Sequence, residues 1–189
     1  MASVLVSGVP AHVAEVGTAL RAHDADVTEV GALADMHRVC ADLPPGSLDA
    51  YVQLAASFQA AGDTAIRRVH HFYANGVLAR FAALDAAMPA LAPGARVVFV
   101  LGVLPPEVAT EEDREARRAL TRVLGHAARA DARDGKLVTR VLESGATPDE
   151  ISQVALGLDP ARQELMAKLD ELSYADWRVE LLGLAMVET

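Results

Sequence analysis

Residues 96–101 read Arg-Val-Val-Phe-Val-Leu, an almost wholly apolar run of β-branched and aromatic side chains. Such a run predicts a strand with helices on both faces, because a strand with one face in water alternates apolar and polar residues. We therefore expect it at the centre of a parallel sheet. The rest of the chain should supply the neighbouring strands and the covering helices.

On both sides of this run, strand patterns alternate with helical patterns. Further strands are predicted at residues 3–7, 26–30, 48–55 and 136–142. Helices are predicted at residues 11–22, 61–91, 110–133, 148–156 and 160–172, while 179–187 fits either state. Because strands alternate with helices, we expect an α/β fold with a doubly wound parallel sheet.

Two proline–glycine signals divide the pattern further. Segment 31–46 shows no helical or strand period and ends in Pro44-Pro45-Gly46, so we expect it to be irregular. Pro93 and Gly94 are expected to end the long helix that begins near residue 61.

Length and composition narrow the class of protein. The 189 residues fit one domain, with residues 160–189 as a C-terminal tail, and the 52% hydrophobic content argues against disorder. A formal net charge of −9 disfavours nucleic acid, because phosphate contacts need an excess of Lys and Arg. The first ten residues lack a signal-peptide pattern, and no apolar run reaches membrane-spanning length, so we expect a cytoplasmic protein with no membrane partner.

Metal and thiol chemistry are not favoured. Cys40 is the only cysteine, which excludes an internal disulfide and a cysteine-built zinc site, and a lone thiol beside apolar residues is most often a packing residue. The six histidines show no H-x-x-x-H or H-E-x-x-H spacing, and the neighbours His70 and His71 point to different faces of a helix. We expect no metal site.

In open parallel sheets, ligands bind beyond the carboxyl ends of the strands. The loops after Val6, Val52, Leu101 and Leu142 are therefore where function should be encoded. The first of them reads Ser7-Gly8-Val9-Pro10-Ala11-His12-Val13-Ala14, and the strand at 49–56 reads Asp-Ala-Tyr-Val-Gln-Leu-Ala-Ala.

These segments occur in the order of the landmarks of short-chain dehydrogenases/reductases, which the chain resembles over about residues 3–145. The family's opening turn, T-G-x-x-x-G-x-G, corresponds to residues 7–14, where Gly8 is kept while His12 and Ala14 replace the other two glycines. The family's D-V-L-V-N-N-A-G strand is similar to residues 49–56, with Gln53 and Leu54 in place of the asparagines. The resemblance implies a Rossmann-like fold without dinucleotide binding, so no cofactor is expected.

The positions that match the family's catalytic residues carry other side chains. Tyr73 lies where the resemblance places an asparagine, with Asn75 two residues away, and Gly102 lies where it places a serine. Thr110 and Arg114 take the places of the tyrosine and lysine of Y-x-x-x-K. About 18 residues separate the second strand from Asp49, where the family has an extra helix and strand. The same shortened middle occurs in the inactive N-terminal domain of high-molecular-weight 3-oxoacyl-thioester reductases, which this chain resembles.

The chain keeps two long predicted helices that resemble the family's subunit-contact helices. In the family, the counterparts of residues 61–91 and 106–133 form a four-helix bundle between subunits. Eight interface residues are expected on this resemblance: Tyr73, Val77, Leu84, Met88, Ala116, Leu120, Val123 and Ala127.

Three functions remain open at this point. The leading hypothesis is a non-enzymatic subunit that associates with itself or with an active short-chain dehydrogenase or ketoreductase. The second is a regulatory domain whose remodelled cleft, near His12, Tyr73 and Gly102, binds a nucleotide or an acyl-CoA-type ligand. The third, least favoured, is an altered enzyme that uses His12 with Asp35 or Asp42.

Overall fold

The computed structural model describes residues 1–55, 60–102, 110–111, 114–115, 118–119 and 135–158. The side chains of Leu33 and of residues 76–81 are outside this description. The chain divides into two compact units, Met1–Gly157 and Leu158–Thr189. The first unit contains all the strands and helices described below.

Five parallel strands form the sheet: β1 (Ser3–Ser7), β2 (Asp26–Val30), β3 (Leu48–Gln53), β4 (Leu91–Leu101) and β5 (Leu137–Glu143). Their order is β2-β1-β3-β4-β5, a doubly wound arrangement of Rossmann-like character. The predicted α/β class and parallel sheet are therefore confirmed. The chain reverses its direction across the sheet between β1 and β3.

The expectation that residues 96–101 lie at the centre of the sheet is wrong. The middle strand is β3, and β4 lies between β3 and β5. The apolar run nevertheless has the predicted cause, because Val97, Val98 and Val100 are all buried. An interior strand next to an edge strand is covered on both faces like a central one, so its composition does not distinguish the two positions.

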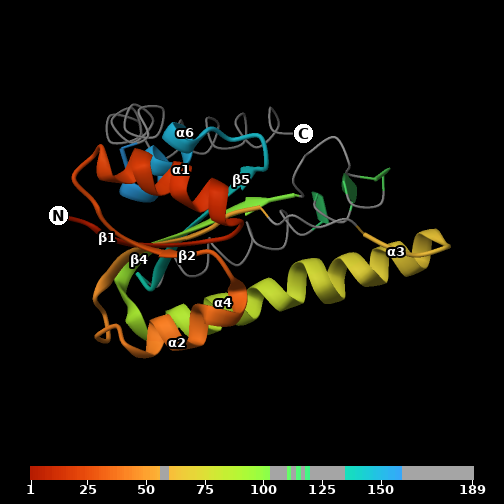
Figure 1. Ribbon diagram of the computed structural model, residues 1–189, viewed down its shortest axis with the longest axis horizontal. Coiled ribbons are helices and arrows are strands. Elements are labelled where there is room, and N and C mark those ends of the chain that lie inside the picture. The colour runs from red at the N-terminus through yellow and green to blue at the C-terminus, as the bar shows by residue number, and fades with distance from the viewer. Residues whose placement is uncertain (56–59, 103–109, 112–113, 116–117, 120–134, 159–189) are drawn as a thin grey trace, which may run out of the picture. The chain divides into compact units, whose positions relative to one another are not determined.

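Helices cover both faces of the sheet, as Figure 1 shows. Helix α1 (Pro10–Arg21) packs on α6 (Pro148–Leu156) over one face, and α2 (Met36–Ala41) packs on α4 (Ala79–Ala87) over the other. Each face has its own apolar cluster. Val6, Val52 and Ile151 belong to the α1/α6 cluster, and Leu5 and Val97 to the α2/α4 cluster.

Segment 31–46 was expected to be irregular, and this expectation is wrong in part. It contains the 3-10 turn η1 (Leu33–Asp35) followed by α2. Met36 and Cys40, four residues apart, are buried in the α2/α4 cluster. A helix of six residues contains too few repeats to show a period in the sequence, and its contact with the sheet stabilises it.

Residues 65–90 form a continuous helical stretch, shorter than the predicted helix at both ends. It consists of α3 (Ala65–His71), the π-helical segment η2 (Phe72–Leu78), α4, and the 3-10 turn η3 (Met88–Ala90). Leu91 already belongs to β4 rather than to the helix.

The predicted helix stop at Pro93 and Gly94 is also wrong, since both residues lie within β4. The register between β3 and β4 shifts there, because Leu48 pairs with Leu91 whereas Ala50 pairs with Arg96. This irregularity accommodates the proline and a glycine with φ of +77°.

Candidate functional site

Three polar side chains are buried together at the carboxyl edge of the neighbouring inner strands β1 and β3. Ser7, Tyr51 and Gln53 are 0%, 0% and 3% exposed. Ser7 pairs with Gln53 in the parallel register, and Tyr51 precedes Gln53 by two residues, so all three lie on one face of the sheet. This is the α2/α4 face, because Tyr51 belongs to that apolar cluster.

Hydrogen bonds join these three side chains. The Tyr51 hydroxyl donates to Gln53 Oε1 at 3.3 Å and lies 2.8 Å from Ser7 Oγ. A phenol has one proton, so Ser7 donates to Tyr51 when Tyr51 donates to Gln53. The cluster satisfies polar groups that would be costly to bury alone.

The loop after β1 is held by the protein itself. The Gly8 N–H donates to the Val30 carbonyl at 3.2 Å, and the Leu54 N–H donates to the Ser7 carbonyl at 2.9 Å. Gly8 has φ of +154°, and a Cβ placed on it would lie 2.7 Å from Leu54 Cβ. Leu54 itself is 1% exposed. The glycine thus permits the close approach of Leu54, and the Gly8 amide is used inside the fold.

His12 lies in the first turn of α1 and is half-buried. Its Nδ1 atom is buried and has no hydrogen-bond partner among the described residues. Burial lowers the pKa of His12 below its usual value, although the nearby Glu15 carboxylate opposes this shift. Ala14, the other replaced glycine, is exposed on α1. Burial of His12 therefore disfavours the charged imidazole relative to the neutral one.

The four positions that match catalytic residues are dispersed over several elements. Tyr73 lies in η2, half-buried and edge-to-face with Phe72, their ring centroids 5.8 Å apart. Gly102 follows β4 with φ of +122°. The Arg114 N–H donates to the Thr110 carbonyl at 3.1 Å, so these two residues bound one helical turn. The Arg114 guanidinium lies 3.3 Å from the Glu111 carboxylate.

The predicted interface residues have different environments. Leu84 is partly buried against the α2/α4 cluster, whereas Met88 is 42% exposed. The side chain of Val77 is not described. Four predicted positions lie outside the described residues: Ala116, Leu120, Val123 and Ala127.

Other candidate chemistry is sparse in the part of the chain that the structure describes. No three His, Cys, Asp or Glu residues gather there in a way that could hold a metal ion. Cys40 is buried, and this burial raises the pKa of its thiol, which disfavours the reactive thiolate. Among the same residues, no helix has the length and apolar character needed to cross a membrane.

Comparison with known proteins does not assign the chain. No model of a known protein family matches it, and no curated protein matches it significantly. The structure shows the fold alone, which is a five-stranded parallel sheet of Rossmann-like character.

The buried cluster of Ser7, Tyr51 and Gln53 was not predicted from the sequence. One signal was available, since Tyr51 and Gln53 stand two residues apart in an otherwise apolar strand, and Ser7 ends the strand that pairs with it. Period-2 spacing places Tyr51 and Gln53 on one face. Their contact with Ser7 depends on the pairing of β1 with β3, which the sequence pattern does not define.

Proposed function

We propose that this chain is a non-catalytic, Rossmann-like subunit that associates with another protein through its helical stretch 65–90. The partner is a second copy or an active short-chain dehydrogenase or ketoreductase subunit. One observation carries the proposal: Ile66 is 75% exposed near one end of this stretch, and Met88 is 42% exposed near the other. A partner that lies along the helical stretch would remove both apolar side chains from water.

The composition of α3 supports this proposal. The helix contains no buried residue. Val69 and Tyr73 follow Ile66 by three and seven residues and are half-buried, so the three apolar side chains share one face of the helix. A helix face of this kind gains stability from a partner that covers it.

The carboxyl edge of the sheet supports the absence of dehydrogenase catalysis. The Gly8 amide, which a phosphate-binding turn would present to its ligand, donates to Val30. The later glycine positions of such a turn, which let the backbone approach a pyrophosphate, carry the side chains of His12 and Ala14. Gly102 has no hydroxyl, and a threonine at 110 has no phenol for proton transfer.

The experiment compares variants by sedimentation velocity over a range of protein concentrations. We expect the double variant Ile66→Ser/Met88→Gln to weaken association by at least about tenfold, since two exposed apolar side chains contribute at least 1.4 kcal/mol at an interface. Leu158→Ser is the matched control, because Leu158 is 41% exposed but lies outside the helical stretch. Equal association of both variants would contradict the proposal.

Affinity capture of the tagged full-length chain from its native host distinguishes the two partners. Recovery of a subunit carrying Y-x-x-x-K, lost in the double variant, supports the heteromeric form. Recovery of the chain alone, with concentration-dependent self-association, supports the homomeric form. A monomer under both conditions would contradict association.

A second candidate function is ligand binding near His12. It is favoured by the buried Nδ1 atom of His12, to which none of the residues that the structure describes forms a hydrogen bond. Thermal unfolding with dinucleotides and acyl-CoA thioesters tests it, because a ligand at a hundred times its dissociation constant stabilises the folded state by about 2.7 kcal/mol. A shift seen in the natural chain and lost in His12→Asn supports the ligand site, and no shift with either ligand class contradicts it.

A further inference from the structure

Residues 60–64 after β3 lie back against the first turns of α3, and we call this segment the strap. At its first residue, Ala60 is buried, with 6% of its surface exposed. At its last residue, the Thr64 side chain accepts a hydrogen bond from the Arg67 N–H at 3.4 Å. Between them, the Ala61 N–H donates to Nδ1 of His71 at 3.1 Å. A histidine of α3 therefore holds the middle of the strap.

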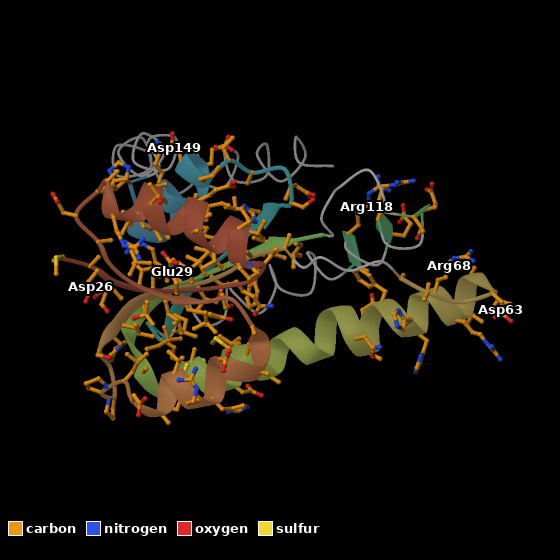
Figure 2. The ribbon with its side chains drawn as sticks, viewed as in Figure 1. Asp26, Glu29, Asp63, Arg68, Arg118 and Asp149 are labelled. Carbon is orange, nitrogen blue, oxygen red and sulfur yellow. The ribbon has the colours of Figure 1, made fainter. Side chains whose placement is uncertain are left out.

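The strap packs closely on the helix. Gly62 has φ of +152°, and a Cβ on it would lie 2.8 Å from Arg67 Cβ and 2.9 Å from the Arg68 backbone nitrogen. The Arg68 side chain donates to the Gly62 carbonyl at 3.5 Å. Figure 2 shows Asp63 and Arg68 at this end of α3. A larger residue than glycine would separate the strap from the helix.

The hydrogen bond from Ala61 requires a neutral His71. A backbone N–H can only donate, so Nδ1 must present its lone pair, and the proton of the neutral ring must then be on Nε2. Protonation places a second N–H at Nδ1 and removes the acceptor. The Ala61 N–H and the Nδ1–H of His71 would then be two donors facing each other.

The charges around His71 add to this effect. On α3 itself they are positive or become positive in acid: Arg67, Arg68 and His70. The strap contributes Asp63, which lies 3.4 Å from the Arg67 guanidinium. The adjoining segment η2 contributes no charged residue and one ionisable group, the Tyr73 hydroxyl. A protonated His71 thus adds its charge to a helix that already carries Arg67 and Arg68.

We propose that the strap is a pH-sensitive latch, which His71 holds closed on α3 when its imidazole is neutral and releases when it is protonated. Histidine is the side chain suited to such a latch, because protonation of the imidazole converts a ring nitrogen from an acceptor into a donor. Release uncovers the first turn of α3 and frees the backbone that follows the carboxyl end of β3.

Two-dimensional amide NMR of the full chain between pH 5 and 8 tests the latch. We expect the Ala61 amide signal to titrate with the same midpoint as the His71 ring protons. Its protection factor against hydrogen exchange should fall about three- to tenfold on the acid side, the factor for one lost hydrogen bond. An Ala61 amide that does not follow the His71 titration would overturn the proposal.

Variants separate the latch from general acid effects. His71→Gln keeps an acceptor oxygen without titrating, so the Ala61 amide should stay protected across the whole range. His71→Ala and Gly62→Ala should both lower its protection at every pH. His70→Gln is the matched control and should leave the Ala61 titration unchanged, since His70 is exposed. A pH response that persists in His71→Gln would also overturn the proposal.

Discussion

The carboxyl edge of the sheet and helix α3 differ in how far their side chains are buried. At the edge, Ser7, Tyr51 and Gln53 are buried and hydrogen-bonded to one another, and Leu54 packs against Gly8. On α3, by contrast, no side chain is buried and Ile66 is 75% exposed. Polar side chains at the edge are thus paired inside the core, whereas the helix presents apolar side chains to solvent. The difference supports a role in association.

The largest effect is expected from a side chain at Gly8, which would break the packing of the edge. Gly8→Val places its Cβ against Leu54 in a backbone conformation that side chains rarely adopt. Strain and overpacking together should lower the free energy of unfolding by about 3–5 kcal/mol, as measured by urea denaturation.

Gly46→Ala is the control for backbone strain alone. Gly46 has φ of +68°, and a Cβ there would meet nothing within 4 Å. We expect a loss of about 1 kcal/mol. If the two variants lose equal stability, the contact of Gly8 with Leu54 does not contribute.

Removal of the Tyr51 hydroxyl tests the buried cluster. Tyr51→Phe leaves Ser7 and Gln53 without their shared partner inside the core, so we expect the free energy of unfolding to fall by about 1–3 kcal/mol. The double variant Ser7→Ala/Tyr51→Phe should be less destabilised than the sum of the single variants, because each change removes the same hydrogen bond. Additive losses in chemical denaturation would show that the two hydroxyls do not interact.

A smaller, pH-dependent effect is expected from His12. Burial lowers the pKa of His12 in the folded state, so the unfolded chain binds the proton more tightly. The stability that the neutral ring contributes is therefore complete above the unfolded pKa of about 6.5 and is lost as the pH falls through the lower, folded value.

His12→Asn removes this titration. Its free energy of unfolding should decrease less between pH 7 and pH 5 than that of the natural chain. His23→Asn, at an exposed histidine, should keep the natural pH profile. Denaturation curves at both pH values measure the two variants. Identical profiles for the natural chain and His12→Asn would show that His12 does not cause the pH dependence.

The smallest effect on the free energy of unfolding is expected in the helical stretch 65–90. Ile66→Ser should change the free energy of unfolding by less than about 0.5 kcal/mol at a concentration where the chain is monomeric, because the side chain is already in solvent. A loss above 2 kcal/mol would mean that Ile66 is a core residue. The helical stretch would then bury its apolar side chains as the sheet edge does.

The sequence by itself determined the approximate positions of the strands apart from the first half of β4, the parallel α/β class and the helix Pro148–Leu156. These features are local: β-branched runs extend, and the Thr147–Glu150 capping box starts α6 within four residues. Helix α2, the π-helical segment η2 and the strand with Pro93 and Gly94 were missed, since contacts or neighbouring strands stabilise them.

Only the tertiary structure decided which residues meet at the carboxyl edge. Ser7 and Tyr51 are 44 residues apart, and their hydrogen bond exists because β1 pairs with β3 in one register. Likewise, Gly8 matches a phosphate-binding turn in sequence, yet the side chain of Leu54 occupies the space that its missing Cβ leaves. A residue type specifies what an atom can donate, accept or fill, whereas its partner depends on the packing of distant segments.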